Sequence, residues 1–232
     1  DAVAAREGLI AVYPGGSGGL PGGRLLTWNA GHCCAYAMRN HVDDVGFLGA
    51  VIDRLVAGDR ADPARVYVTG MSNGGMMSHR LGRELSGKVA AIAPVVGALF
   101  GDEPAPAGPV AAYIIVGADD RTVPAAGGPL GGRGAAAAGG PPEDHPLAPA
   151  AAQATYWTKA NGCGAGKTTV SAAATETVWT GCKSGKDVVY VVVANNGHAW
   201  PGGRPGREGA DPPSPAFNAS EAIWAFFKRQ SR

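Results

Sequence analysis

The sequence is poor in charged and aromatic side chains: 17% of its 232 residues are charged and 7% are Phe, Trp or Tyr. The formal net charge is only +1, so the chain carries no basic patch typical of proteins that bind nucleic acid. No apolar run approaches the roughly 18 to 20 residues that a membrane-crossing helix needs. We therefore expect neither nucleic acid nor a membrane as a partner.

Three cofactor signatures are missing as well. The four cysteines do not have the CxxC spacing of a zinc site. The glycine-rich loop at 15–23 lacks a GxGxxG match, and no acidic residue follows about 20 positions later to hold a ribose. Lys167 lies in a segment similar to a phosphate-binding loop, but the first glycine of that motif is Asn161 here. The sequence therefore predicts no cofactor.

The chain is long enough for one sizeable core. With 45% hydrophobic residues, residues 1–232 are expected to form one α/β domain rather than two domains. Short apolar runs predict buried strands, and apolar residues spaced i, i+3, i+4 predict helices. The expected strands are 9–13, 66–70, 89–96, 111–116 and 188–193, and the expected helices are 42–56, 73–85, 150–160 and 220–228. This alternation predicts a mainly parallel sheet with helices on both faces.

Residues 125–149 interrupt this pattern. They consist largely of Gly, Ala and Pro and have no hydrophobic period. We expect a mobile surface insertion near the site, with poorly ordered ends, rather than a packed element.

The segment 66–77 is the most informative part of the chain. It reads Val-Tyr-Val-Thr-Gly-Met-Ser-Asn-Gly-Gly-Met-Met, a β-branched run that stops at Gly70, presents Ser72 and continues as a helix pattern. This order is typical of a nucleophile elbow, in which the serine lies on a sharp turn between a strand and a helix. Glycine makes up 37 of the 232 residues, so a Gly-x-Ser-x-Gly match can arise by chance. The motif therefore indicates a nucleophile only together with the segments around it.

That context includes candidates for the other groups that a reactive serine needs. A serine hydroxyl requires a base to take its proton and a third group to orient that base. Asp119 and Asp120 follow the expected strand 111–116, and His198 follows the expected strand 188–193. Loops at the ends of parallel strands are where such folds place reactive groups. The order Ser, Asp, His predicts acyl transfer, with either adjacent acid as the third member.

The four cysteines allow three pairings. Cys163 follows an Asn-Gly turn and Cys182 follows Thr-Gly after a strand-like stretch, so a bridge between them would close a loop of about 20 residues and contribute roughly 3 kcal/mol. Such a disulfide favours an exported protein. The alternative is four reduced cysteines in a cytosolic protein.

Four motifs together resemble the poly(3-hydroxybutyrate) depolymerase and feruloyl esterase family of α/β-hydrolases. They are Trp-Asn-Ala-Gly-His-Cys-Cys (28–34), Val-Asp-Asp-Val-Gly-Phe (42–47), Gly-Met-Ser-Asn-Gly-Gly-Met (70–76) and Gly-His-Ala-Trp-Pro-Gly (197–202). The resemblance implies an α/β-hydrolase fold and extracellular ester hydrolysis without a metal. It assigns the acid to Asp120, through the stretch 116–124, and one oxyanion donor to the backbone N–H of Asn73. Ser72 and His198 become nucleophile and base.

The resemblance also implies that part of the sheet is absent. The family carries an earlier strand, followed by a His-Gly loop with a second oxyanion donor, between the strand expected at 9–13 and the elbow strand. Its removal would leave a gap of about 10 Å, two strand spacings. We expect a preceding segment or a partner chain to fill this gap. One of the adjacent Cys33 and Cys34 is then expected to pair with the absent segment.

Several side chains near these motifs are candidates for binding substrate. Trp28, Met71, Met76 and Trp200 could line an apolar groove, with core packing as the alternative for most of them.

The expected substrate is a polyester of the polyhydroxybutyrate type or its oligomers, or else a feruloyl or acetyl ester on plant polysaccharide. A noncatalytic binding protein on a hydrolase scaffold is the competing function, and a peptidase is disfavoured because the chain has no room for a substrate-gating domain. Activity is expected to fall below about pH 6 to 7, where histidine gains a proton.

Overall fold

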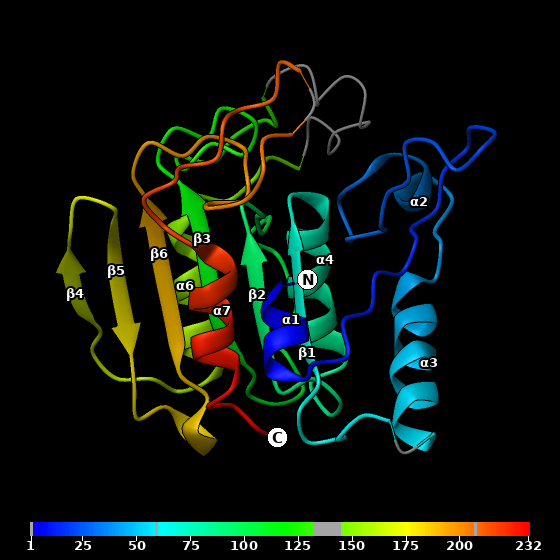
Figure 1. Cartoon of the computed structure of the whole chain (residues 1–232), viewed down its shortest axis with the longest axis horizontal. Helices are drawn as coiled ribbons and strands as arrows, with labels where there is room; N and C mark the ends of the chain where they lie inside the picture. Colours follow the sequence, from blue (N-terminus) through cyan, green and yellow to red (C-terminus); the bar gives the residue numbers. More distant parts are fainter. Residues whose placement is uncertain (1, 59, 132–144, 207) are drawn as a thin grey trace.

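A six-stranded mixed sheet forms the core of the protein (Figure 1). The computed structural model describes residues 2–58, 60–131, 145–206 and 208–232. The strand order is β1-β2-β3-β6-β5-β4. The strands β1, β2, β3 and β6 pair in parallel, whereas β5 pairs in antiparallel fashion with both β6 and β4. The strands are β1 (Tyr67–Met71), β2 (Ala91–Val95), β3 (Ala111–Gly117), β4 (Lys167–Val170), β5 (Ala174–Trp179) and β6 (Val188–Val193). The predicted α/β fold with a mainly parallel sheet is confirmed.

Helices cover both faces of the sheet. On one face, Phe226 of α7 (Ala219–Phe227) packs with Tyr113 of β3, and Figure 1 shows this helix in front of the strands. On the other face, Trp157 of α6 (Ala151–Ala160) packs with Ile92 of β2. A Cβ on Gly82 of α4 (Asn73–Glu84) would lie 2.9 Å from Ile92 and 3.1 Å from Trp157, so α4 shares this second face. The side chains of β2 and β3 are thus buried from both sides, whereas the residues of β1 are half-buried or exposed.

The remaining helices lie outside these layers. Helix α3 (Asp44–Ala57) packs on α4 through Leu48, Met77 and Leu81. It begins where the Asp43 side chain accepts the Gly46 N–H at 2.9 Å, which caps its first turn. The short elements are α1 (Ala2–Glu7), α2 (Ala35–Arg39) and the 3₁₀ turn η1 (Lys183–Gly185). None of the helices in the described ranges has the length and apolarity to cross a membrane.

The strand predicted at 9–13 is wrong. This segment forms no strand, and its large side chains are exposed, from 36% at Leu9 to 76% at Tyr13. The apolar run alone suggested a buried strand, but a strand also needs a neighbour for its backbone groups, and no described strand lies beside these residues. Among the described strands, β1 pairs with β2 alone and is therefore an edge strand.

The antiparallel hairpin β4–β5 was not predicted. Its residues are rich in threonine and largely exposed or half-buried, so they lack the continuous apolar run of the parallel strands. The short helices α1 and α2 were also missed, because they contain too few residues for a helical period to be visible. The other predicted elements lie within about three residues of the observed bounds.

The segment predicted as an insertion, 125–149, is described only at its two ends, because residues 132–144 lie outside the described residues. The ends pack more closely than predicted. Gly128 and Leu147 exchange two backbone hydrogen bonds of 2.8 Å, and the Leu147 side chain is 3% exposed in a cluster with Val123. These contacts place the ends of the segment beside the loop that follows β3.

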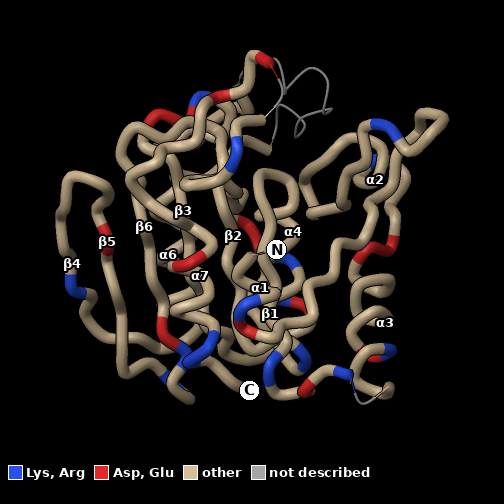
Figure 2. The backbone as a smooth tube through the Cα atoms, in the orientation of Figure 1, with Lys and Arg blue, Asp and Glu red and all other residues tan. Residues whose placement is uncertain are grey.

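Charged residues of both signs are interspersed along the chain (Figure 2). The picture shows no large stretch of one sign on the described part, in agreement with the formal net charge of +1.

Candidate active site

Ser72 lies on the turn between β1 and α4, with φ 58° and ψ −121°. Positive φ is uncommon for a residue other than glycine and marks local backbone strain. A Cβ on Gly70 would lie 2.5 Å from the backbone of Gly74, so only glycine allows the chain to fold this tightly around the turn. The Ser72 N–H donates to the carbonyl of Val95 at 2.9 Å. This geometry is that of a sharp strand-to-helix turn that presents a half-buried serine.

Asp120 is the buried member of the adjacent acid pair that follows β3. It is 6% exposed, whereas Asp119 is exposed. Its Oδ1 accepts the backbone N–H groups of Thr122 and Val123, both at 2.8 Å. Its Oδ2 lies 2.9 Å from Nδ1 of His198. Both carboxylate oxygens are therefore held, and one of them is directed at the imidazole.

His198 joins the other two side chains. It lies in the loop after β6, and its Nε2 is 2.8 Å from Oγ of Ser72. A proton on Nδ1 is donated to Asp120, which leaves Nε2 free to accept the hydroxyl proton of Ser72. The structure thus brings together three residues predicted from the sequence, although 126 positions separate Ser72 from His198.

Two further residues, missed in the sequence analysis, hold the histidine loop. The backbone N–H of His198 donates to Asp211 Oδ2 at 2.6 Å. Asn196 is fully buried; its amide donates to the Ala199 carbonyl at 3.0 Å and its Oδ1 accepts the Ser214 N–H at 2.9 Å. The Asn-Gly pair at 196–197 is a turn signal that could have drawn attention to Asn196. Asp211 lies in a stretch without hydrophobic period, so no local signal identifies it.

An open polar cavity of about 260 Å³ adjoins this loop. Its lining residues are Asp119, Arg121, Asn195, Gly197, Asp211 and Pro212.

Asn73, the predicted oxyanion donor, is the first residue of α4. Its backbone N–H has no acceptor within the helix because it belongs to the first turn, and the helix dipole makes this end electropositive. Its side chain has a separate role, since Nδ2 donates to the Trp28 carbonyl at 3.0 Å and Oδ1 accepts the Trp28 N–H at 2.7 Å. The loop at 28–34 is thereby fixed beside the nucleophile turn.

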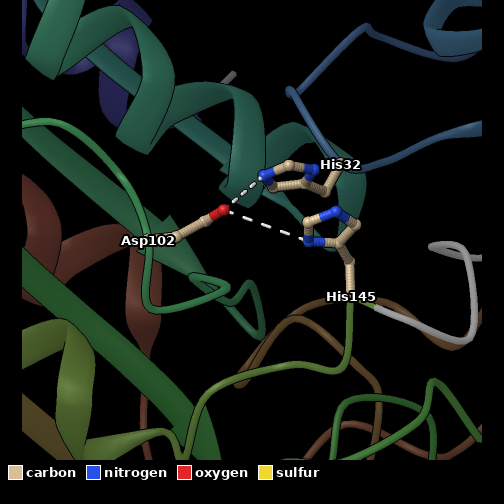
Figure 3. Close-up of side chains that lie close together, drawn as sticks. All are labelled: His32, Asp102 and His145. Carbon is tan, nitrogen blue, oxygen red and sulfur yellow. Dashed lines mark hydrogen bonds and ion pairs between the residues drawn. The ribbon is translucent and has the colours of Figure 1, made fainter.

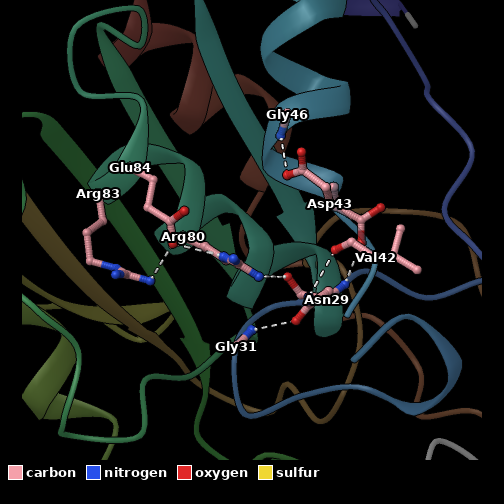
Figure 4. A network of polar contacts seen from close by, with 9 residues as sticks. Asn29, Gly31, Val42, Asp43, Gly46, Arg80, Arg83 and Glu84 are labelled. Atoms are coloured by element: carbon pink, nitrogen blue, oxygen red, sulfur yellow. Dashed lines mark hydrogen bonds and ion pairs between the residues drawn. The ribbon is translucent and has the colours of Figure 1, made fainter. Parts of the chain in front are cut away.

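A polar network holds the same loop against α3 and α4 (Figure 4). Arg80 donates to the Asn29 carbonyl at 2.6 Å, while the Asn29 N–H donates to Asp44 Oδ2 at 2.7 Å. Asp44 is 2% exposed, and this burial raises the pKa of its carboxyl, against the opposing effects of the Asn29 N–H and the Arg80 charge. Asp44 therefore does more than favour the start of a helix: it ties the loop to α3.

Three of the four predicted substrate-binding side chains, Trp28, Met71 and Trp200, are half-buried. Met71 and Trp200 pack against the apolar cluster beneath α7, and Trp28 packs against the cluster between α3 and α4. Met76 is 3% exposed and belongs to the core. These contacts agree with the packing alternative for Met76, and a role of the other three in a groove stays a prediction.

The cysteines form two pairs. Cys163, after α6, is joined to Cys182, before η1, which is the pairing that the sequence analysis favoured. The adjacent Cys33 and Cys34 are buried and paired with each other. The expectation that one of them pairs with an absent segment is therefore not met.

The chain is similar to proteins that are named esterases. It is 33% identical over 170 residues to "Putative esterase NocK" of Nocardia uniformis subsp. tsuyamanensis, which covers 69% of this chain and 49% of that protein. It is 36% identical over 91 residues to "Feruloyl esterase B" of Piromyces equi, covering 39% of this chain and 16% of that protein. It is 29% identical over 97 residues to "Bifunctional acetylxylan esterase/xylanase XynS20E" of Neocallimastix patriciarum, covering 42% of this chain and 12% of that protein.

No family model matches the chain. The chain spans about half the length of the first of these relatives and a smaller part of the other two. The names support the esterase part of the predicted resemblance, and none of the three mentions a polyester depolymerase.

Proposed function

We propose that this protein is a serine carboxylic ester hydrolase. The observation that carries the proposal is the continuous hydrogen-bonded series from Asp120 through His198 to Ser72, with distances of 2.9 and 2.8 Å. Nucleophile, base and orienting acid in this arrangement are the groups that acyl transfer requires. The similarity to proteins named esterases supports the same activity.

In the first half-reaction, Oγ of Ser72 attacks the ester carbonyl carbon while Nε2 of His198 takes the hydroxyl proton. Asp120 stabilises the imidazolium that forms. The Asn73 N–H donates to the oxyanion of the tetrahedral intermediate. When the intermediate collapses, the ester C–O bond breaks and His198 returns the proton to the leaving alcohol, which leaves an acyl group on Ser72.

In the second half-reaction, water replaces the alcohol. His198 takes a proton from the water while the water oxygen attacks the acyl carbonyl carbon. The ester bond to Ser72 then breaks, and His198 returns the proton to Oγ of Ser72. The products are an acid and an alcohol, and the cycle needs no oxidant, reductant or metal ion.

For the substrate we propose a feruloyl or acetyl ester of a polysaccharide, with polyhydroxybutyrate oligomers as the second candidate. Two of the relatives are named for feruloyl and acetylxylan ester hydrolysis, which favours the first class. A panel of methyl ferulate, p-nitrophenyl acetate and hydroxybutyrate oligomers separates the two. A kcat/KM at least about tenfold higher for the oligomers would reverse this order.

Labelling with a fluorophosphonate tests the proposed chemistry. The reagent should form an adduct at Ser72 that is lost in Ser72→Ala and kept in the matched variant Ser86→Ala, which removes a hydroxyl elsewhere. No adduct, together with no hydrolysis of any ester in the panel, would favour a noncatalytic binding protein.

We further propose that another strand of the same protein pairs with the free edge of β1. Among the described strands, only β2 pairs with β1, although the elbow strand bears the proposed nucleophile. An unpaired strand edge is a typical site for strand addition. The side chains of Leu9, Ile10 and Val12 are also exposed and apolar. This strand would also bring a second oxyanion donor near Ser72.

The intact mass of the protein isolated from its source tests the added strand. A mass larger than that of the 232 residues is expected. A mass equal to the 232 residues, combined with full esterase activity, would refute the added strand and leave the proposed chemistry intact.

We propose that the protein works outside the cytosol. The bridge between Cys163 and Cys182 supports this, because disulfides persist in oxidising compartments. Recovery of the active protein mainly from the culture medium of its source would agree with this proposal, and recovery from the cytosol with free thiols would contradict it.

A further inference from the structure

A cluster of three side chains lies outside the hydrogen-bonded series described above (Figure 3). His32, Asp102 and His145 come from three separate loops, and their potential ligand atoms all lie within 4.8 Å of one another. Oδ2 of Asp102 is 3.0 Å from Nε2 of His32 and 4.0 Å from Nδ1 of His145. In Figure 3, dashed lines join one nitrogen of each imidazole to the same carboxylate oxygen.

From this geometry we propose a binding site for one divalent transition-metal ion, most favourably Zn²⁺. Two imidazole nitrogens and one carboxylate oxygen are a common zinc ligand set, with solvent as the fourth ligand. Bonds of 2.0 to 2.1 Å in a tetrahedral site place the ligand atoms about 3.3 Å apart. The two distances from Asp102, 3.0 and 4.0 Å, bracket this separation.

Binding requires one imidazole ring to turn. The two rings are stacked, with centroids 3.9 Å apart and planes inclined by 14°, so their nitrogen lone pairs do not converge on one point. His32 is restrained by an edge contact with Phe100 at 5.2 Å, whereas the His145 side chain is 36% exposed. A rotation of the His145 ring about its side-chain torsions would bring its Nδ1 toward the shared site.

The donor set also determines which ions are favoured. Ca²⁺ takes six to eight oxygen ligands and Mg²⁺ prefers an octahedron of oxygens, so a site with two nitrogens and one carboxylate suits neither. Imidazole suits Zn²⁺, Cu²⁺ and Ni²⁺. The half-exposed position leaves room for the water that completes the coordination.

The ion would fasten together segments that already touch. The Ala148 N–H donates to the Leu99 carbonyl at 2.9 Å, which joins the loop of His145 to that of Asp102. Leu147 and Val123 share one apolar cluster, so the same region lies beside the loop that carries Asp120. A bound ion is therefore expected to stabilise the fold near the proposed site without taking part in ester hydrolysis.

Calorimetric titration of chelator-treated protein with ZnCl₂ tests the site. We expect one ion per chain, and an affinity reduced at least about tenfold in His32→Asn, His145→Asn and Asp102→Asn, since even outer partners of a metal site contribute that much. The matched control is His41→Asn, which removes an exposed histidine outside the cluster and should bind zinc as the unmodified protein does. Titrations with Ca²⁺ and Mg²⁺ should give no binding.

Thermal unfolding gives a second readout. Zinc at about one hundred times its Kd should raise the Tm by roughly 5 to 10 °C, and the three cluster variants should lose this shift while keeping the circular dichroism spectrum of the unmodified protein. Asp102 is 53% exposed at its side chain, so its replacement should leave the fold intact.

Three results would overturn the proposal. They are no binding at about 100 µM zinc, equal binding in all cluster variants, and binding that is lost in His198→Asn but kept in His32→Asn. The last result would place the ion at the proposed active site.

Discussion

Asp119 and Asp120 are adjacent residues with the same side chain and different surroundings. Only Asp120 is buried, and only it contacts His198. Asp120→Asn should lower kcat by about 10³ to 10⁴, because an amide cannot hold the imidazole in the productive tautomer. Asp119→Asn should change kcat less than about threefold. Steady-state kinetics on a p-nitrophenyl ester measures both.

The two variants together identify the orienting acid. A larger loss in Asp119→Asn than in Asp120→Asn would show that the buried carboxylate does not serve the proposed base.

Gly197 is the residue before the proposed base, and it has no room for a side chain. A Cβ at this position would lie 2.3 Å from Oδ2 of Asp211, which accepts the His198 N–H. Gly197→Ala should displace His198 and lower kcat by about a hundredfold, the cost of a misplacement of about 1 Å. Gly87→Ala is the control, because no atom lies within 4 Å of its Cβ position. Equal activity of the two variants would contradict a positioning role for this contact.

His198 also makes the proposed activity depend on pH. A protonated imidazole cannot accept the hydroxyl proton of Ser72, so kcat/KM should fall as the solution is acidified. A profile of kcat/KM that stays flat down to pH 4 would contradict the role of His198 as base.

At the scale of elements, a buried histidine connects α4 with α6. His79 is 2% exposed; its Nε2 lies 2.7 Å from Gln153 Oε1, and its Nδ1 accepts the Trp157 indole N–H at 2.9 Å. Burial lowers the pKa of His79 from 6.5 to about 4, because the charged imidazole would lose its hydration. The neutral form is therefore the one that the packed helices accommodate.

This pKa shift predicts a loss of stability in acid. Above pH 6.5, His79 is neutral in both the folded and the unfolded chain, so its titration does not reduce the free energy of unfolding. Between pH 6.5 and 4 the unfolded chain binds a proton that the folded protein does not, so the free energy of unfolding should fall by about 3 kcal/mol from this residue. Urea unfolding at pH 7, 5.5 and 4 measures the change.

His79→Asn separates this effect from other titrations. The variant should be less stable at pH 7 and should lose less stability on acidification than the unmodified protein. An identical loss in both proteins would show that His79 does not cause it.

At the scale of the whole molecule, one disulfide ties the end of α6 to the segment before β6. Cys163 and Cys182 are 19 positions apart, and closing a loop of this size stabilises a protein by about 3 kcal/mol in the chain-entropy model. The double variant Cys163→Ala/Cys182→Ala should therefore have a Tm lower by roughly 6 to 12 °C. The measurement is thermal unfolding followed by circular dichroism.

Esterase activity measured well below the Tm should survive the loss of this bridge. Among the described residues, neither cysteine forms a hydrogen bond with the side chain of Ser72, Asp120 or His198. An unchanged Tm would mean that the bridge adds nothing to the stability of the fold.

The buried elements of this fold were predictable because their signals are local. The apolar run at 188–193 coincides with β6, and the turn at Ser72 follows from the glycines and the strand and helix patterns on either side. Periodicity and turn chemistry act over a few residues, so one sequence suffices to find them. The run at 9–13 failed because an apolar stretch becomes a strand only when another strand lies beside it.

The sequence by itself determined most of the buried elements and supplied the residue types for acyl transfer, because hydrophobic period and strand-to-helix turns are encoded by neighbouring residues. Only the tertiary structure decided which distant groups meet: Asp211 on the His198 N–H, Asn29 between α3 and α4, and His32 beside His145. Hydrogen bonds between loops depend on how whole elements pack, and no local pattern records that geometry.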